Sequence, residues 1–391
     1  MMDTIYEKIT DDDNKNDEII NRAADILKKG GLVAFPTETV YGIGGDALNP
    51  ESSRKIYKAK GRPSDNPLIV HIGNRNQIDG IAEEFPEKAE LLAERFWPGP
   101  LTMVLKKKSC VPPETTGGLE TVAVRMPAHK VAKKLLSSGI YIAAPSANTS
   151  GKPSPTKAGY VYEDLNGRID MIIEDDTVNI GVESTIIDMT KDVPVLLRPG
   201  HISREDIEEI IGHIDVDKTI AGVDNYKKAD KNTRPLAPGM MYRHYAPDAS
   251  LVLVDSDNKG GLSVAENIVK LSLADAARNK KTVILTTDEN TNVYRKLISE
   301  ANVPENGVLF INGDEFIKTL SDISNNILIY VVSLGNRSDL SSIEHNLFTA
   351  LRLCNDIEAE SIYSETFDTD NQGLAVMNRL IKAAGDKIIK V

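Results

Sequence analysis

The densest positive charge in the sequence lies in the stretch KAKGRPSDNPLIVH and just before it. Four cations fall within eight residues of a chain whose formal net charge is −12: Lys55, Lys58, Lys60 and Arg62. Gly61 and Pro63 keep this run from continuing as a helix, and residues 68–72 read as a strand that carries His71. A rigid loop that presents cations at a strand end can bind phosphate, whereas the same cations can also stabilise the negative end of a helix. The stretch alone leaves both readings open.

Polar side chains also lie at the ends of the other short apolar strands predicted in the first half of the sequence. They are Thr39 after strand 32–35, Arg125 ending strand 121–125, Ser146 and Ser154 after strand 140–144, Ser184 before the next strand, and Arg198 near the end of strand 195–200. Loops at strand ends often carry function because the sheet fixes their position. Cations and hydroxyls without a metal triad or a nucleophile–base pair favour electrostatic stabilisation of phosphates over covalent catalysis. Turn formation by the hydroxyls, and a surface ion pair for Arg125, remain alternatives.

The length of 391 residues and the pattern along the chain predict two domains and a linker. We expect a catalytic domain over 1–211, a linker over 212–247 and an α/β domain over 248–391. From residue 251 onward, strands alternate with helices, one of them over 314–323, which predicts an open parallel sheet with helices on both faces. The linker contains MYRHY, whose rings and cations can stack on a base and touch phosphates. An arm that only packs on the first domain is the alternative.

The composition argues against several classes of protein. A negative net charge disfavours stable nucleic-acid binding, because contacts to phosphate supply most of that affinity. Cys110 and Cys354 lie far apart and give neither a disulfide framework nor a CxxC metal site. The polar, acidic start lacks the features of a signal peptide, and no stretch reaches the roughly 18 apolar residues of a membrane span. We therefore expect a cytoplasmic protein with no membrane partner.

Eight motifs, in order, resemble the threonylcarbamoyl-AMP synthase family, also called the YrdC-like family: PTETVYG, KAKGRPSDNPLIVH, WPGPLT, VAVRMPAH, IAAPSAN, SGKPSPT, GVESTI and LLRPG. The rest of the chain resembles the two-domain form of that family. The resemblance implies a twisted, mixed sheet around a basic concave cavity, followed by a smaller Rossmann-like domain. It also implies a nucleotidyltransferase that converts L-threonine, bicarbonate and ATP into L-threonylcarbamoyladenylate and pyrophosphate. A downstream enzyme complex would then transfer the threonylcarbamoyl group to a tRNA adenosine, forming N6-threonylcarbamoyladenosine.

The same resemblance assigns roles to residues of the site. Expected ATP contacts are Arg62, Asn66, Thr121, Ser146, Ser154, Arg198 and, in a linker that closes over ATP, His244. Expected threonine contacts are Thr39, His71, Arg125, the backbone of Ala144, and Ser184. The expected catalytic set is Lys58, Lys60 and Arg62, which would stabilise phosphate charge as a threonine carbamate attacks the α-phosphorus. Mg²⁺ would be carried mainly by the ATP phosphates rather than by a protein metal site.

Two other function classes fit parts of the pattern. An RNA-binding module could use the basic loop to grip tRNA, although the acidic balance and the lack of interleaved basic and aromatic residues weigh against it. A carbamoyl transferase could place carbamoyl phosphate in the same pocket. Product formation without threonine or bicarbonate would favour the transferase, and salt-dependent tRNA binding without turnover would favour the RNA-binding module.

Overall fold

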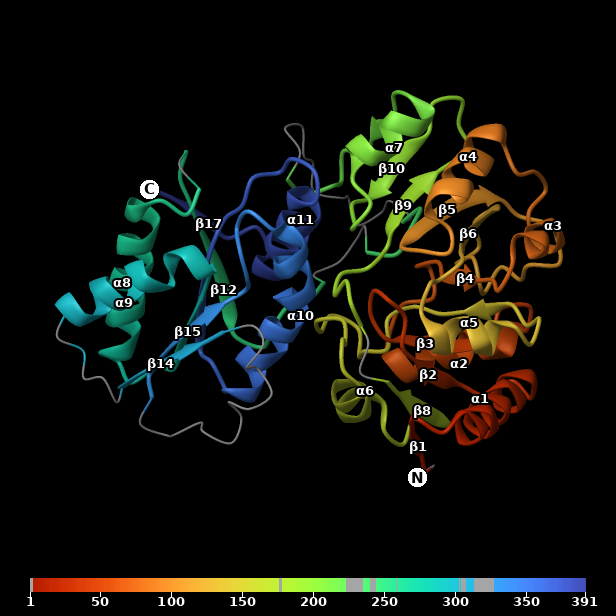
Figure 1. Ribbon diagram of the computed structural model, residues 1–391, viewed down its shortest axis with the longest axis horizontal. Coiled ribbons are helices and arrows are strands. Elements are labelled where there is room, and N and C mark those ends of the chain that lie inside the picture. The colour runs from red at the N-terminus through yellow and green to blue at the C-terminus, as the bar shows by residue number, and fades with distance from the viewer. Residues whose placement is uncertain are drawn as a thin grey trace. The chain divides into compact units, whose positions relative to one another are not determined.

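The computed structural model divides into two compact units (Figure 1). It describes residues 3–175, 178–222, 235–239, 244–257, 259–301, 303, 307–312 and 327–391. Of these, the residues up to 150, 154–220 and 235–239 form the first unit. Residues 151–153, 221–222 and those from 244 onward form the second. None of the described helices is long and apolar enough to cross a membrane.

The first unit is organised around a mixed sheet. Within the described residues its strands are, in spatial order, β1 (Ile5–Lys8), β8 (Met171–Glu174), β2 (Val33–Phe35), β3 (Gly42–Asp46), β7 (Ile142–Ala143), β4 (Ile69–His71), β6 (Thr121–Arg125), β5 (Leu101–Lys106), β9 (Thr185–Asp188), β10 (Val195–Arg198) and β11 (Asp215–Val216). Strand β4 pairs in parallel with β6 and antiparallel with β7, and β5 pairs in parallel with β9 and antiparallel with β6. The prediction of a mixed sheet in the first domain is confirmed.

Short helices connect these strands. They are α1 (Asp13–Lys28), α2 (Pro50–Lys60), the 3₁₀ turn η1 (Arg75–Gln77), α3 (Ile78–Ile81), α4 (Glu87–Phe96), α5 (Lys130–Leu136), α6 (Ala158–Leu165) and α7 (Arg204–Ile211). Helix α2 begins where the Asn49 side chain accepts from the backbone N–H of Glu51, and it ends at Gly61, whose φ of 62° is left-handed. Lys58 and Lys60 lie in its last turn, where their charge complements the helix dipole. The basic stretch is therefore a helix end that leads into a loop.

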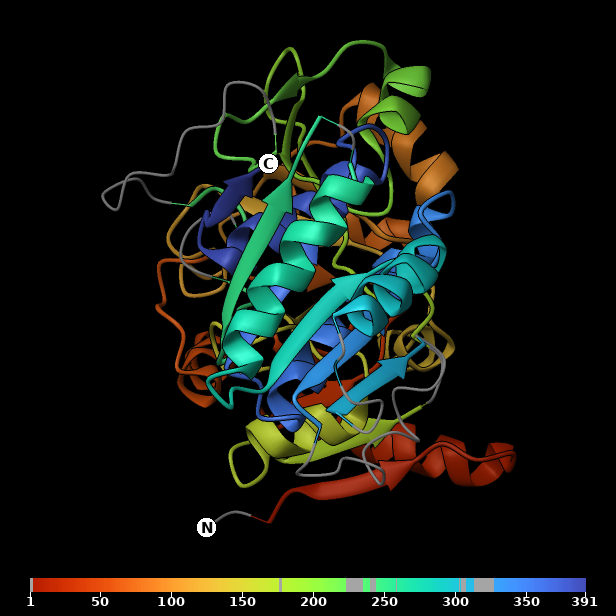
Figure 2. The ribbon, with the colours of Figure 1, turned by 90° about the vertical axis from the view of Figure 1, so that its left-hand side faces the viewer.

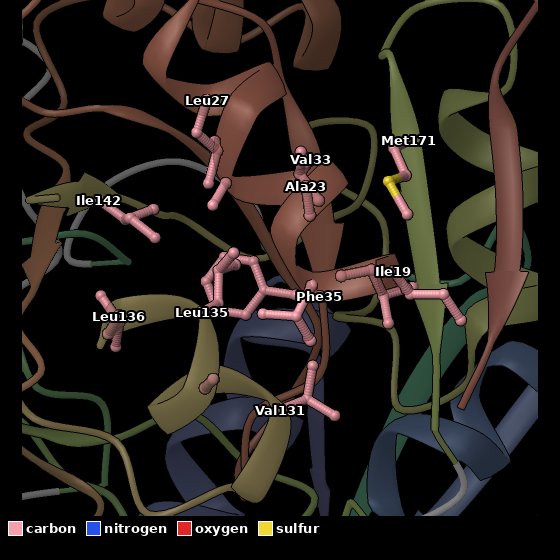
Figure 3. Packing of buried hydrophobic residues seen from close by; sticks show 14 of the residues in the cluster. Ile19, Ala23, Leu27, Val33, Phe35, Val131, Leu135, Leu136, Ile142 and Met171 are labelled. Carbon is pink, nitrogen blue, oxygen red and sulfur yellow. The ribbon is translucent and has the colours of Figure 1, made fainter. Parts of the chain in front are cut away.

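One apolar core fixes the half of the sheet that carries the first site loops (Figure 3). Helix α1 contributes Ile19, Ala23 and Leu27, and α5 contributes Leu135, which pack around Phe35 of β2. Each of these side chains is almost fully buried, and burial of a large apolar side chain contributes about 1.5–3 kcal/mol. The core therefore holds the end of β2, and with it the loop that follows, in a defined position.

The second unit has a parallel sheet. Its described strands are, in spatial order, β14 (Val308–Ile311), β15 (Ile329–Ser333), β13 (Thr282–Thr286), β16 (Ser361–Glu365), β12 (Ser250–Asp255) and β17 (Ile388–Lys390). Helices α8 (Leu262–Ala276) and α9 (Asp288–Glu300) cover one face, and α10 (Leu340–Asp356) and α11 (Gly373–Ala384) cover the other (Figures 1 and 2). This confirms the predicted parallel sheet with helices on both faces. The helix expected over 314–323 lies outside the described residues.

Strand β3 was not predicted, because its sequence GIGGD is typical of a loop. The structure explains the glycines by close packing. A side chain at Gly44 would place its Cβ 2.8 Å from Cγ2 of Ile142 and 2.9 Å from a ring carbon of Phe35. Glycine is needed here because the neighbouring side chains occupy the space above the strand. The glycine-rich stretch is therefore a strand that is closely packed at Gly44.

Candidate functional site

Three strands of the first unit place polar side chains in register. His71 of β4 lies opposite Arg125 of β6, and Arg125 lies opposite Thr102 of β5. Residues directly opposite each other point to the same face of a sheet. His71, Arg125 and Thr102 therefore form a row across three strands, and all three are buried. We call it the His71–Arg125–Thr102 row.

An apolar patch lies beside this row on the same face. Ile69 of β4, Ala123 of β6 and Val104 of β5 are each two positions from a member of the row, and strand periodicity turns them to the same side. They pack in one cluster with Ala237 of the linker, which is fully buried. The site thus combines charged and hydroxyl groups at one end with a flat apolar surface next to them. Such a combination is typical of small-molecule sites.

Arg125 is held by three acceptors from different parts of the chain. Its Nε donates to the carbonyl oxygen of Gly99 at 3.3 Å, its Nη1 to Oγ1 of Thr39 at 3.0 Å, and its Nη2 to Oε1 of Glu38 at 2.6 Å. Thr39 Oγ1 also lies 2.8 Å from Oγ1 of Thr37. The loop after β2 therefore fixes the guanidinium at the end of β6. The structure brings together Thr39 and Arg125, as the resemblance implies for a threonine site.

Glu38 forms a buried ion pair with Arg125. The Glu38 side chain is 9% exposed and that of Arg125 is 5% exposed. Burial alone raises the pKa of Glu38, but the charge and hydrogen bond of Arg125 outweigh it, together with the backbone N–H groups of Glu38 and Ala128. The pKa of Glu38 therefore lies below its usual value, and the carboxylate is charged at neutral pH.

His71 is neutral in this environment. Complete burial and the positive charge of Arg125 lower its pKa to about 3. Its Nδ1 lies 3.2 Å from the carbonyl oxygen of Ile69, two residues earlier on the same strand. A neutral imidazole can donate or accept a hydrogen bond without adding charge to the site. Near neutral pH, His71 can therefore contact a ligand hydroxyl without drawing in an anion.

Ser184 connects the row to Arg198. Oγ of Ser184 lies 2.8 Å from Oγ1 of Thr102, and Nη2 of Arg198 donates to the same Oγ at 3.1 Å. Arg198 also donates from Nε to the carbonyl oxygen of Ser184 at 3.0 Å and from Nη1 to that of Pro238 at 3.3 Å. Arg198, expected at ATP, thus touches Ser184, expected at threonine. The two predicted groups of residues adjoin here.

Lys60 and Lys58 are separated by the geometry of α2. Lys60 is buried, and its ammonium donates to the carbonyl oxygens of Ser146 and Asn148, the latter at 2.7 Å, and lies 3.4 Å from Oδ1 of Asn148. Ser146 Oγ donates to the same Oδ1 at 2.5 Å. Lys58 is exposed, because two positions along a helix correspond to a turn of about 200°. The structure thus joins Lys60 with Ser146 and leaves Lys58 outside this group.

Other expected ATP contacts lie toward the opposite end of the same strands. Nη2 of Arg62 donates to the carbonyl oxygen of Pro67, just before β4, at 3.2 Å. Asn66 is buried, and its Oδ1 has no hydrogen-bond partner among the described residues. Thr121 begins β6, so four residue steps, roughly 13 Å, separate it from Arg125. A buried amide oxygen without a partner is costly, and a bound ligand can satisfy it.

The remaining predicted residues have defined surroundings. Ser154 is buried, and its Oγ donates to Oε1 of Glu183 at 2.5 Å. The backbone N–H of Ala144 donates to the carbonyl oxygen of Ile69, next to the row. His244 belongs to the second unit, where its ring centroid lies 5.6 Å from that of Tyr245. Its contact with ATP stays a prediction, and the other residues of MYRHY up to Arg243 lie outside the described part of the chain.

Sequence reasoning did not assign four residues that the structure places in this network. Glu38 forms an ion pair with Arg125, and the hydroxyl of Thr102 hydrogen-bonds to that of Ser184. Asn148 accepts a hydrogen bond from Lys60, and Glu183 accepts one from Ser154. Three of them stand within motifs that were quoted as strand-end loops, so their positions were available as a signal. Thr102 lies inside a predicted strand, and only the register of β5 with β6 reveals it.

Comparisons with known proteins agree with the geometry. A family model described as "Telomere recombination" matches residues 25–200, and one described as "Threonylcarbamoyl-AMP synthase, C-terminal domain" matches residues 202–385. The chain is 43% identical to a threonylcarbamoyl-AMP synthase of Bacillus subtilis over 98% of this chain and 97% of the relative. It is 44% identical to one of Pyrococcus abyssi over 95% of this chain and 96% of the relative.

A solved structure, that of P. abyssi Sua5 complexed with L-threonine, superposes with a TM-score of 0.81 at 41% sequence identity. The superposition covers 99% of both chains. The matches thus extend over both units, and the resemblance found in the sequence is confirmed. The chain belongs to the threonylcarbamoyl-AMP synthase family.

Proposed function

We propose that the His71–Arg125–Thr102 row binds L-threonine and that the neighbouring loops bind ATP. The family's reaction joins L-threonine, bicarbonate and the AMP part of ATP into L-threonylcarbamoyladenylate and releases pyrophosphate, and this chain is an enzyme of that nucleotidyltransferase type. The observation that carries the proposal is the hydrogen-bonded connection from Arg198 through Ser184 to Thr102. It joins a cation suited to phosphate with the strand next to Arg125, a cation suited to a carboxylate.

The proposed roles follow from the charges and contacts. Arg125 holds the threonine carboxylate, His71 and Thr39 contact the ligand without adding charge, and the backbone of Ala144 borders it. The free amine of threonine displaces water from bicarbonate to give a carbamate, whose oxygen attacks the α-phosphorus. The bond from that phosphorus to the bridging oxygen breaks, and pyrophosphate leaves. Positive groups stabilise the charge that develops on the phosphate oxygens.

Arg62 and Arg198 are the proposed cations for that step. Lys60 takes a positioning role in this arrangement, because its ammonium is already bonded to the loop 146–148. It would hold Ser146 in place for ATP while adding its charge to the pocket. Asn66, with its buried and unsatisfied amide oxygen, would accept a donor such as the adenine amino group or a ribose hydroxyl. Thr121, Ser154 and the exposed Lys58 complete the expected ATP side.

Mg²⁺ is proposed to enter with ATP. Within the described residues, no three His, Cys, Asp or Glu side chains are grouped to hold a metal ion. The metal would neutralise charge on the phosphates that the protein cations also contact. The remaining proposals concern the cell: a downstream complex that transfers the threonylcarbamoyl group to tRNA, and a cytoplasmic location.

The linker is proposed to cover the bound nucleotide. Ala237 packs on the apolar patch beside the row, and the carbonyl oxygen of Pro238 accepts from Arg198 at 3.3 Å. These contacts place residues 235–239 on the same face as the proposed site. His244 follows shortly in sequence and is the proposed linker contact to ATP. Opening of this segment would release the adenylate.

The deciding experiment detects the adenylate directly. Purified protein is incubated with ATP, Mg²⁺, bicarbonate and L-threonine, and the product is identified by mass, with each substrate omitted in turn. We expect L-threonylcarbamoyladenylate only when all are present. Arg62→Ala should abolish threonine- and bicarbonate-dependent pyrophosphate release. His244→Ala should raise the KM for ATP if the linker contacts the nucleotide.

Control substitutions are available at exposed residues of the same type. Arg54 lies on α2, the helix before the loop that carries Arg62, and is exposed and paired with Glu51 and Glu114, so Arg54→Ala should retain full turnover. His213 is exposed, so His213→Ala is the control for His244. Near-normal turnover of a folded Arg62→Ala protein would remove Arg62 from the proposed site. Product formed without threonine would point instead to a carbamoyl transferase.

A further inference from the structure

We propose that Glu38 binds the α-ammonium group of threonine, so that the Glu38–Arg125 pair recognises the zwitterion as a whole. The inference rests on the proposed threonine site and adds a second charged group to it. Oε1 of Glu38 lies 2.6 Å from Nη2 of Arg125. In an α-amino acid, a single carbon atom separates the carboxylate carbon from the ammonium nitrogen. A ligand whose carboxylate lies against Arg125 therefore brings its ammonium group next to Glu38.

Both partners retain hydrogen-bonding capacity. A carboxylate offers about four acceptor positions, and described residues fill three of them on Glu38: Arg125 at Oε1, the backbone N–H of Ala128 at Oε2, 3.1 Å away, and the backbone N–H of Glu38 itself. A guanidinium has five N–H donors, and three of those of Arg125 have acceptors in the described structure. Donors and acceptors thus remain on both sides of the pair. An ammonium and a carboxylate one carbon apart match that requirement.

The charge of the row leads to the same conclusion. Glu38 and Arg125 cancel, and His71 is neutral because burial and Arg125 lower its pKa to about 3. A ligand carrying only a carboxylate would add one uncompensated negative charge to this buried group of three residues. A zwitterion adds none, because its two charges pair with Arg125 and Glu38 separately. Glu38, Arg125 and His71 together therefore favour an amino acid over a simple hydroxy acid.

The test separates the ammonium from the carboxylate by means of three ligands. L-Threonine carries both groups, L-threoninol lacks the carboxylate, and (R)-3-hydroxybutyrate lacks the ammonium. Their dissociation constants are measured by calorimetry for the full-length protein and for Glu38→Gln. We expect Glu38→Gln to weaken L-threonine and L-threoninol by roughly 10- to 150-fold, whereas 3-hydroxybutyrate should bind equally well or more tightly, because Arg125 then lacks its counter-charge. Asp188→Asn, which alters a buried carboxylate bonded only to Thr190 in the described structure, should change none of the three.

The outcomes that overturn the inference are distinct. If Glu38 only orients Arg125, then Glu38→Gln weakens L-threonine and 3-hydroxybutyrate together and leaves L-threoninol unchanged. If all three affinities are unchanged, Glu38 has no part in binding. If the unaltered protein does not bind L-threonine at all, the proposed function itself fails. If the Glu38→Gln protein unfolds below the assay temperature, Glu38→Asp replaces it. Aspartate keeps the negative charge but lies one methylene farther from the ligand. The same ligands should then lose affinity, by a smaller factor.

Discussion

Two carboxylate–guanidinium pairs, one in each unit, have a buried carboxylate and share the same closest approach, although Arg337 of the second pair is 24% exposed. Glu38–Arg125 in the first unit and Glu365–Arg337 in the second both have an N···O distance of 2.6 Å. Apart from arginine, the described donors to Glu38 are two backbone N–H groups, those of Ala128 and of Glu38 itself. Glu365 instead receives Oγ1 of Thr286 at 2.7 Å and Nδ2 of Asn290 at both oxygens.

The two pairs therefore differ in how completely they are satisfied. Glu365 is fully buried at the carboxyl end of β16, and its hydrogen bonds tie β13 and the first turn of α9 to that strand. Glu38 and Arg125 are almost as deeply buried but keep unused donors and acceptors. A buried polar group that is left incompletely bonded costs stability, and proteins keep such groups where a ligand completes them. The number of hydrogen bonds to the carboxylate, rather than the N···O distance, separates the structural pair from the proposed binding pair.

The largest expected effect comes from removing each arginine. Arg125→Ala should lower kcat/KM for L-threonine by roughly 30-fold to several thousand-fold, the equivalent of about 2–5 kcal/mol, because it removes the cation that binds the carboxylate of threonine. Arg337→Ala should instead destabilise the second unit by about 3–5 kcal/mol, because Glu365 is left buried without its counter-charge. Its kcat/KM should stay within about threefold when the protein is folded. Pyrophosphate release and denaturant unfolding measure the two quantities.

A folded Arg337→Ala protein that loses as much kcat/KM as Arg125→Ala would break the comparison. In that case, the second unit would contribute to catalysis through Glu365. Lysine variants at both positions serve as controls. Arg125→Lys should recover little activity because it loses the planar fork that a carboxylate fits, whereas Arg337→Lys should recover part of the lost stability because it restores the charge.

The difference between the units also shows what the sequence can predict. The parallel sheet of the second unit was predictable, because strands and helices alternate with short connections and each has its own hydrophobic period. In the first unit β3 was not, because tight packing around Gly44 selects glycines that resemble a loop in sequence. The resemblance implied that Lys58 and Lys60 line one pocket. The angle of about 200° between their positions on α2 leaves Lys58 exposed while Lys60 reaches Ser146, so the role of Lys58 stays a prediction.

Within the site, residue types were predictable and pairings were not. Arg125, Ser184 and Arg198 were expected from their positions at strand ends and from family resemblance; the structure bonds Arg198 and Thr102 to Ser184 and places Thr102 opposite Arg125. The partner of each depends on register between strands distant in sequence. Thr102 faces Arg125 only because β5 pairs antiparallel with β6 at that residue. A shift of one residue would turn Thr102 to the opposite face.

A second prediction concerns acid, and it extends the comparison to His71. Burial and Arg125 lower the pKa of His71 to about 3, so between that value and its usual pKa near 6.5 the imidazole is neutral when folded and protonated when unfolded. Unfolding then takes up a proton, and the free energy of unfolding falls as pH falls, by about 1.4 kcal/mol per pH unit. Between pH 6.5 and 5.0, we expect the unaltered protein to lose about 2 kcal/mol more than His71→Asn.

Denaturant unfolding at both pH values measures this difference. Above pH 7, the difference in unfolding free energy between the two proteins should not change with pH, because His71 is then neutral in both the folded and the unfolded state. Curves for the two proteins that run parallel down to pH 5 would show that His71 is solvated or charged when folded, and that the row carries a positive charge at neutral pH. Glu38, Arg125 and His71 would then carry a net positive charge together, and a ligand with only a carboxylate would no longer be disfavoured. The second unit offers the internal reference, because its transition should be unaffected by His71→Asn.

The smallest expected effect distinguishes two buried threonine hydroxyls. Thr102 Oγ1 lies 2.8 Å from Oγ of Ser184, whereas Oγ1 of Thr282, at the start of β13, has no hydrogen-bond partner among the described residues. Replacement by valine keeps the shape and removes the hydroxyl. A neutral hydrogen bond is worth about 0.5–1.5 kcal/mol, so Thr102→Val should reduce kcat/KM for L-threonine by roughly 2- to 13-fold.

Thr282→Val is the matched control, and it should leave kcat/KM unchanged while keeping or raising the stability of the second unit. Removing a buried hydroxyl without a partner eliminates a desolvation cost, so the second unit should unfold at the same or a higher denaturant concentration, with kcat/KM unchanged. A loss of activity in Thr282→Val similar to that in Thr102→Val would mean that shape, rather than hydrogen bonding, underlies both effects. An unchanged Thr102→Val would show that Ser184 keeps its position through Arg198 alone, whose Nε and Nη2 both reach that residue. The row would then end at Arg125, and the threonine side of the site would be smaller than the register of β5 suggests.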